Sequence, residues 1–342
     1  MSAYVPQGVL RGQEPMSRHV SWRAGGLARA CYIPKDSDDL ADFVATRAAS
    51  EHLHVVGLGS NLLVRDGGLD AIVVLTHGAL RRLEVLTQRG QTPNQEWGLT
   101  PNHEDGLTLE VEAGVPAPKV ARQAARLGAA GAEFLAGIPG TMGGALAMNA
   151  GCYGSETWDF VTSVVTLDRT GQLHLRTPAD YEIGYRHVVI KGSDPARGLT
   201  PTTPTTPTTP TMAPPTPLEP SAEWFISARL TFPRGDSAAA LQRIRELLAR
   251  RVATQPLGEP NAGSVFRNPE GAYAAQLIEG CGLKGEREGG AEVSRKHANF
   301  IVNRGGATAL DIETLIYRVQ SRVLQDKGVA LMTEVRIVGS NA

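Results

Sequence analysis

The sequence predicts a mixed α/β or α+β protein of two or three domains rather than a helical bundle. The chain has 342 residues, and a typical domain takes about 100–200. Its 38 glycines and 22 prolines predict many turns, and stretches of strand and helix periodicity alternate between them. Hydrophobic residues make up 42 % of the chain, which is enough for sizeable cores and excludes a disordered protein.

The charge balance argues against two classes of partner. The chain has 34 Lys and Arg against 35 Asp and Glu, which gives a net charge of −1. Non-specific binding to nucleic acid or to a membrane surface needs a positive field. We therefore expect neither of these partners.

The N-terminal part of the chain follows a β-α-β-β pattern. Strands are expected at residues 30–33, 53–56, 62–64 and 71–75. Between the first two strands, Asp36, Ser37 or Asp38 can cap a helix with an apolar stripe. Glycine turns separate the later strands.

The middle of the chain mixes strands with one clear helix and one low-complexity tract. Strands are expected at 107–112, 161–167, 172–176 and 223–232, and a helix at 118–127. Nine Thr and seven Pro fill 16 of the 18 positions of Thr200–Pro217. Such a tract cannot bury apolar surface, so we expect an extended surface insert. A binding tail for a proline-recognising domain is the alternative.

The last third of the chain carries its longest helical patterns. Helices are expected at 238–252, 271–279 and 308–327, and strands at 299–302 and 331–338. Thr308 can cap the last helix and Gly328 can end it. A domain boundary is expected near residue 232.

Cysteine spacing and an uncharged segment exclude other classes of protein. Cys31, Cys152 and Cys281 lie far apart, which excludes a disulfide framework and a cysteine-based zinc site. No His, Cys and carboxylate cluster has metal-ligand spacing, so no metal is expected. Phe134–Ser155 has no charge over 22 residues, but its six glycines and Pro139 argue against a membrane span. Because the N-terminus has no apolar core of signal-peptide type, we expect a cytoplasmic protein.

Two glycine-rich loops are candidates for a ligand site. Residues 57–61, with the sequence GLGSN, follow a strand, but the next residues favour another strand instead of the helix that a Rossmann site requires. This loop is therefore either a phosphate-binding nest or an ordinary β-turn. Residues 137–151 are uncharged and rich in glycine, which suits close approach to a large cofactor or a buried crossover between strands. Together the two loops favour a dinucleotide bound by a fold other than the Rossmann fold.

Five motifs occur in the order of one known family. They are GLGSNLLVRDGG at 57–68, AGIPGTMGGALAMNAGCYG at 136–154, GYR at 184–186, NAGSVFRNP at 261–269 and TEVRI at 333–337. From residue 19 to residue 339 the chain resembles the UDP-N-acetylenolpyruvoylglucosamine reductase family, also called UDP-N-acetylmuramate dehydrogenases. Outside the Thr/Pro tract, the resemblance covers nearly the whole chain.

The resemblance implies an α+β fold with an FAD-binding domain of the vanillyl-alcohol-oxidase (PCMH) type and a C-terminal α+β substrate-binding domain. The FAD-binding domain would span 17–232, with subdomains of about 17–78 and 79–232. The substrate-binding domain would span 233–342, and its last strand, 331–338, would return to the active site. FAD would be bound without a covalent link by Gly57, Gly59, Ser60, Asn61, Gly137, Ile138, Pro139, Gly140, Thr141, Gly143, Asn149, Gly151 and Tyr153.

The implied reaction is the NADPH-dependent, FAD-mediated reduction of UDP-N-acetylglucosamine enolpyruvate to UDP-N-acetylmuramate, in peptidoglycan precursor synthesis. An enolate-like species must be stabilised and then protonated. The motifs place the proton donor at Ser264, the cation for the carboxylate at Arg186 and a third group, an acid, at Glu334. Each has a plainer interpretation: Ser264 as a turn residue, Arg186 as a surface arginine and Glu334 as a strand-edge carboxylate paired with Arg336 or another base.

The substrate's diphosphate needs local cations, and several basic residues could supply them. Candidates for it are Arg251, Arg267, Lys284 and Lys296, each of which could equally be a solvated surface charge. The family motifs add Tyr185 and Asn268 as substrate contacts. His297 is interpreted as structural or substrate-contacting. The Ala275–Gln276 step departs from the basic or aromatic residue expected in the substrate pocket.

Two other functions remain possible at this point. One is a different FAD oxidoreductase of the same superfamily, and the other is a catalytically silent flavin-binding scaffold that recruits partners through the Thr/Pro tract. The presence of Arg186, Ser264 and Glu334 argues against the scaffold. We expect a monomer.

Overall fold

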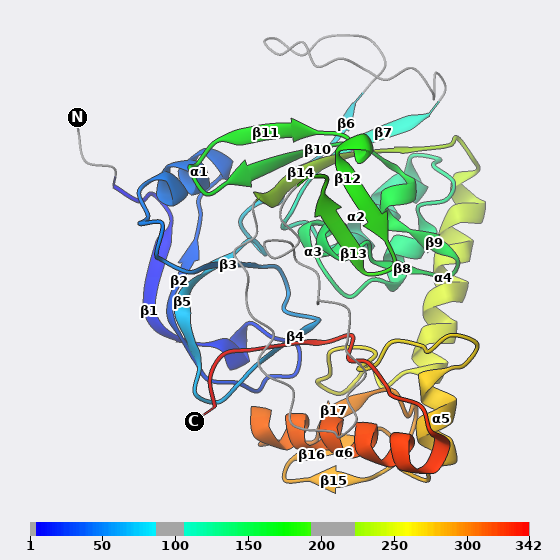
Figure 1. The fold of residues 1–342 in the computed structure, drawn as a ribbon. Coiled ribbons are helices and arrows are strands. Elements are labelled where there is room, and N and C mark those ends of the chain that lie inside the picture. The colour runs from blue at the N-terminus through cyan, green and yellow to red at the C-terminus, as the bar shows by residue number, and fades with distance from the viewer. Residues whose placement is uncertain (1–4, 87–105, 193–222, 342) are drawn as a thin grey trace.

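The computed structural model describes residues 5–86, 106–192 and 223–341 (Figure 1). The tract Thr200–Pro217 lies outside the described residues. The described elements form three units, two of them each built around a sheet and the third around the helix α6.

The N-terminal unit is a four-stranded sheet in the order β1-β2-β5-β3. Its elements are β1 (Val9–Pro15), η1 (Met16–Arg18), β2 (Leu27–Ile33), α1 (Ser37–Ala45), β3 (Leu53–Val56) and β5 (Leu69–Leu75). Strand β1 pairs antiparallel with β2, whereas β5 runs parallel to both β2 and β3. Of the three possible caps that the sequence indicates, Asp36 caps α1 by accepting a hydrogen bond from Asp39 N at 2.9 Å. Strand β4 (Leu62–Val64) lies outside this sheet.

The second unit is a five-stranded antiparallel sheet in the order β11-β10-β14-β7-β6. Its strands are β6 (Leu83–Leu86), β7 (Leu107–Glu112), β10 (Val161–Asp168), β11 (Leu173–Arg176) and β14 (Glu223–Phe232). The helices α2 (Ala117–Arg126), η2 (Glu133–Gly137) and α3 (Met142–Ala147) share its core. Smaller elements follow: β8 (Gly151–Cys152), β9 (Ser155–Glu156), η3 (Thr157–Asp159), η4 (Pro178–Asp180) and the hairpin of β12 (Tyr181–Gly184) with β13 (His187–Ile190).

The third unit is built around α6. Helix α4 (Ser237–Thr254) precedes it. The unit's own elements are α5 (Ala274–Gly280), β15 (Arg287–Glu288), β16 (Ala291–Val293), β17 (Ile301–Asn303), α6 (Ala309–Lys327) and β18 (Arg336–Val338). Thr308 and Asp311 form a capping box at the start of α6, and Gly328 ends it in the left-handed region at φ 67°. The predicted cap and stop of this helix are confirmed.

The predicted strand at 331–338 is wrong in extent, because only β18 has the hydrogen bonds of a ladder. The residues before β18 are bonded instead to the segment around residue 266: Arg267 N donates to Met332 O at 2.9 Å, and Glu334 N to Val265 O at 2.7 Å. An isolated bridge joins Phe266 to Thr333. The alternating pattern indicated extended backbone, but it could not indicate that the partner changes along it.

The N-terminal and C-terminal units are joined by buried contacts. Strand β18 pairs in parallel with β4. Trp22 is fully buried in the C-terminal core, where its Nε1 donates to Ile301 O at 2.7 Å. Arg65 forms an ion pair with Glu313 of α6 at 2.6 Å, with both side chains about 95 % buried. These contacts hold the C-terminal unit against the strand that follows the first glycine loop.

Helix α4 connects the second and third units. It runs from the upper to the lower part of the molecule in Figure 1. Its residues Ala240 and Ile244 belong to the core of the second unit, with α2 and η2. The boundary near residue 232 stays a prediction. No helix in the described ranges is long and apolar enough to cross a membrane.

Candidate active site

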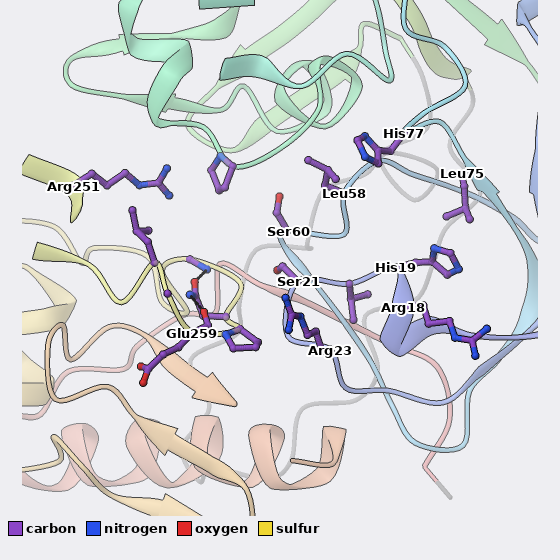
Figure 2. Close-up of a pocket in the computed structure, with 18 of the residues that line it drawn as sticks. Arg18, His19, Ser21, Arg23, Leu58, Ser60, Leu75, His77, Arg251 and Glu259 are labelled. Carbon is purple, nitrogen blue, oxygen red and sulfur yellow. Dashed lines mark hydrogen bonds between the residues drawn. The ribbon is translucent and has the colours of Figure 1, made fainter. Parts of the chain in front are cut away.

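A cavity of about 650 Å³ opens where the three units meet. This volume lies within the range of small-molecule and cofactor sites. It is lined by residues 18–21 and 23, by Gly57, Leu58 and Ser60 of the first glycine loop, by Pro139 of the second, and by residues 257–261 and 263 of the C-terminal unit. Figure 2 shows Arg251 at one end of the cavity and Arg18 and His19 at the other.

Neighbouring segments can pack against the first glycine loop only because its glycines have no Cβ atom. A Cβ on Gly57 would lie 2.2 Å from Thr141 Oγ1, and one on Gly59 would lie 2.2 Å from His19 O. Gly59 also has φ 57°, which glycine adopts without strain. The loop therefore touches both the second glycine loop and the N-terminal segment, and Ser60 lies on the cavity wall.

Arg186 and Glu334 form an ion pair beside the segment of Ser264. The Nη2 atom of Arg186 lies 2.6 Å from Glu334 Oε1, and the two side chains are 20 % and 10 % exposed. Arg186 follows β12 in the turn of the hairpin and has φ 55°. Glu334 N donates to Val265 O, which places the acid's main chain one residue from Ser264. Segments far apart in the sequence are thus brought together.

Burial shapes the electrostatics around Glu334. It raises the pKa of the Glu334 carboxyl, although the neighbouring Arg186 and Arg267 oppose the rise. Within the described ranges, Nε of Arg186 and Nε of Arg267 are buried and have no hydrogen-bond partner. Burial and the charge of Arg267 also lower the pKa of Arg336. Arg186 and Arg267 each have an unused Nε donor close to the Glu334 carboxyl group, so they form a site suited to an anion.

Comparisons with known proteins agree on one family. Residues 255–338 match the model of the UDP-N-acetylenolpyruvoylglucosamine reductase C-terminal domain, and residues 28–175 match an FAD binding domain. The UDP-N-acetylenolpyruvoylglucosamine reductases of Thiobacillus denitrificans and Nitrosospira multiformis are 52 % and 51 % identical to the chain. These alignments cover 97 % and 98 % of this chain, and 94 % and 90 % of the two relatives.

The chain belongs to the UDP-N-acetylenolpyruvoylglucosamine reductase family.

A solved structure agrees with this. The crystal structure of UDP-N-acetylenolpyruvylglucosamine reductase from Thermus caldophilus is 27 % identical to the chain and superposes with a TM-score of 0.71, covering 97 % of this chain and 99 % of that one. The α+β fold with an FAD-binding domain is confirmed. So are the reductase activity in peptidoglycan precursor synthesis, the FAD cofactor and the NADPH co-substrate. The different oxidoreductase and the silent scaffold are not supported.

The cavity fits FAD by its charge and by a buried polar group next to its wall, where a Cβ on the lining residue Gly57 would lie 2.2 Å from Thr141 Oγ1. Thr141 is 1 % exposed, and its Oγ1 has no hydrogen-bond partner in the described ranges. A buried hydroxyl without a partner is costly, so a bound group that supplies one is favourable. Arg18 and Arg23 line the cavity, and Glu259 is the single carboxylate among its lining residues, so the charge suits a diphosphate. Gly57, Ser60, Pro139 and Thr141 are the residues that would hold the cofactor's polar parts.

Other predicted FAD residues serve packing in the structure. Cβ atoms on three of the glycines would meet neighbours at 2.4–2.9 Å: Gly137 against Cys152, Gly143 against Ala113 and Gly151 against Ser155. Ile138 is 6 % exposed within the core. Gly140 has room for a Cβ, since its nearest neighbour, Ser60 Oγ, would lie at 3.4 Å.

Asn149, Tyr153 and Asn61 make hydrogen bonds within the protein. The Nδ2 of Asn149 donates to Glu156 Oε2 at 2.6 Å and to Gly184 O at 3.2 Å, two residues before Arg186. Tyr153 Oη donates to Leu247 O at 3.0 Å, and Asn61 Nδ2 donates to Glu334 O at 3.1 Å. Direct contact of these residues with FAD stays a prediction.

The predicted substrate residues lie in different surroundings. Arg251 lines the cavity, donates from Nε to Gln255 Oε1 at 2.7 Å, and has its pKa lowered by burial. Lys284 forms an ion pair with Glu279 at 2.6 Å. Asn268 accepts a hydrogen bond from Ala274 N at 3.1 Å at the start of α5. Tyr185 is 55 % exposed, and its ring lies 5.7 Å from the Arg186 guanidinium.

His297 has a structural environment. Its ring packs against Phe300 at 4.8 Å, and its Nδ1 accepts a hydrogen bond from Asn299 N at 3.3 Å. Burial lowers the pKa of His297. In the described ranges, no three His, Cys, Asp or Glu side chains are grouped so that they could hold a metal ion.

Two parts of the cavity wall were missed by the sequence analysis. One is the segment from Arg18 to Arg23, and the other is Leu257–Asn261. The first segment carries Arg18, His19 and Arg23 within six residues, and this density of basic residues was the available signal. The second has no comparable signal, because its place depends on backbone bonds such as Asn303 N to Pro260 O at 2.9 Å.

Proposed function

We propose that this reductase acts on UDP-N-acetylglucosamine enolpyruvate with Arg186, Glu334 and Ser264 in direct contact with the enolpyruvyl group. The observation that carries the proposal is the 2.6 Å contact between Arg186 and Glu334, whose main chain bonds to Val265 beside Ser264. FAD, when bound, supplies the hydride transfer between NADPH and the substrate's double bond.

The three residues complement the charge that develops in the substrate. Addition of hydride to the terminal carbon leaves negative charge on the adjacent carbon, which the carboxylate stabilises as an enolate, and this adjacent carbon must then receive a proton. The fork of Arg186 binds the carboxylate at two points. Burial raises the pKa of Glu334, and when the substrate's carboxylate occupies Arg186 the Glu334 carboxyl takes up a proton and donates a hydrogen bond to the same group. Ser264 Oγ gives its proton to the carbon and regains one from water, which completes the reduced lactyl ether.

The proposal also includes the domain bounds and the substrate contacts. We place the FAD-binding domain at 17–232, with subdomains of about 17–78 and 79–232, and the substrate-binding domain at 233–342. Strand β5 ends at Leu75 and β6 begins at Leu83 in a different sheet, which supports the division near residue 78. Substrate binding is assigned to Tyr185, Arg251, Asn268 and Lys284, with Arg251 and Lys284 facing the diphosphate.

We also propose that the enzyme acts as a monomer in the cytoplasm. One chain supplies both the cavity wall and the Arg186–Glu334 pair, which supports a monomer. Analytical ultracentrifugation of the holoenzyme tests this, and a dimer at micromolar concentration would contradict it.

Anaerobic stopped-flow spectroscopy tests the roles in two half-reactions. NADPH should bleach the flavin of the holoenzyme, and UDP-N-acetylglucosamine enolpyruvate should restore its colour. Ser264→Ala should leave bleaching intact and slow recolouring by at least about 10²-fold, the low end for removal of a proton donor. The matched control is Ser321→Ala, since Ser321 Oγ on α6 donates only to Tyr317 O at 2.9 Å among described residues, and it should change neither rate. Equal losses in both half-reactions of Ser264→Ala would contradict the assignment.

A further inference from the structure

Asn61 joins the first glycine loop to the segment that carries Glu334. Its Nδ2 donates to Glu334 O at 3.1 Å, and its main-chain oxygen accepts from Arg336 N at 3.0 Å. The next residue, Leu62, begins β4 and is opposite Arg336 in the parallel pair with β18. Asn61 therefore makes two hydrogen bonds to the main chain of this segment, one at Glu334 and one at Arg336.

The residues on either side of this junction belong to the site. Ser60, immediately before Asn61, lines the cavity. On the other side, Glu334 N donates to Val265 O beside Ser264, and the Glu334 carboxyl group contacts Arg186. Asn61 thus lies where the first glycine loop, which lines the cavity, meets the main chain of Glu334.

We propose that Asn61 is a positioning residue that holds the Glu334 side chain in place relative to the flavin-binding loop. The inference rests on the proposed function, in which Glu334 contacts the substrate carboxylate. The bond from Arg336 N to Asn61 O joins main-chain atoms, which every variant at position 61 keeps, so substitution tests the side-chain bond alone. Loss of the Nδ2 bond leaves Glu334 O without this donor, and a displacement of about 1 Å in an active site can cost about 10²-fold in rate.

Three variants of the holoenzyme test this in the two stopped-flow half-reactions. Asn61→Ala, saturated with added FAD, should be reduced by NADPH within about twofold of the wild-type rate, whereas reoxidation by the enolpyruvyl substrate should slow by at least about tenfold. Asn61→Asp should be at least as slow, because a carboxylate oxygen would face the Glu334 carbonyl oxygen with no proton to donate. Asn61→Gln restores an amide donor on a longer arm and should recover part of the reoxidation rate.

The matched control is Asn303→Ala. Its Nδ2 donates to Trp22 O at 2.9 Å, also between the N-terminal and C-terminal units but at a different contact. This variant should leave the ratio of the two half-reaction rates unchanged. A selective loss in Asn303→Ala, or equal losses in both half-reactions of Asn61→Ala, would overturn the inference.

Glu334→Gln separates the inference from the proposed function. If this variant reoxidises at the wild-type rate, the role proposed for Glu334 fails. If it reoxidises slowly while Asn61→Ala does not, only the positioning role of Asn61 fails.

Discussion

The ion pair between Arg65 and Glu313 allows a quantitative prediction about the joint between the N-terminal and C-terminal units. Arg65 donates from Nε to Glu313 Oε2 at 2.9 Å and from Nη2 to Glu313 Oε1 at 2.6 Å. The side chains are 4 % and 5 % exposed. Removing the charge of one partner from a buried pair typically costs about 3–5 kcal/mol, because the other charge stays in a medium of low dielectric constant.

Glu313→Gln keeps the shape and one acceptor oxygen, so we expect the lower end of this range. The free energy of unfolding should fall by about 3 kcal/mol, which is about a hundredfold in the unfolding equilibrium. Urea unfolding followed by tryptophan fluorescence measures this, since Trp22 is buried in the same C-terminal core. The slope with urea should stay the same, so that the change is one of stability.

A pair between α6 and the residue before β15 provides the control. Arg318 and Glu286 are joined at 2.9 Å, but their side chains are 39 % and 41 % exposed. Glu286→Gln should lower the free energy of unfolding by less than about 1 kcal/mol, because water screens the pair. If Glu313→Gln costs no more than Glu286→Gln, burial does not set the strength of this pair and the reasoning is refuted.

Two further predictions concern the site. Burial raises the pKa of Glu334 against the opposing effect of Arg186, so a substrate carboxylate that occupies Arg186 should raise this pKa further. Substrate binding near neutral pH should therefore be accompanied by proton uptake. Calorimetry in buffers of different ionisation enthalpy measures this uptake. Proton uptake that persists in Glu334→Gln would contradict the prediction. Because folding raises the pKa of Glu334, protonation of this group adds to the free energy of unfolding at low pH. This contribution is lost as the pH rises through the pKa of the folded state. Gly57→Ala would place a Cβ 2.2 Å from Thr141 Oγ1, so overpacking should lower the free energy of unfolding by about 1–3 kcal/mol, and the shifted cavity wall should retain less flavin. Flavin content after gel filtration measures this, and Gly12→Ala, which meets no atom within 4 Å, should retain its flavin.

Local patterns in the sequence determined many of the elements. The bounds of β3, β4, β7 and β14 agree with those expected from strand periodicity, and α6 has the predicted cap and stop. Periodicity and capping depend on residues a few positions apart, so a sequence carries this information directly. The order of five motifs likewise indicated the family, and with it the cofactor and the reaction.

Only the tertiary structure decided which distant segments meet. The pairing of β4 with β18, the contact of Arg186 with Glu334, and the bond of Asn61 to Glu334 each join residues far apart in the chain. A pattern of buried and exposed positions indicates that a segment forms a strand. It does not indicate which other strand it pairs with, because the pairing depends on how the whole chain packs. For the same reason the sequence identified Asn61 and Asn149 as loop residues, whereas the folded chain shows that their amides bond to main-chain atoms of the segments that carry Glu334 and Arg186.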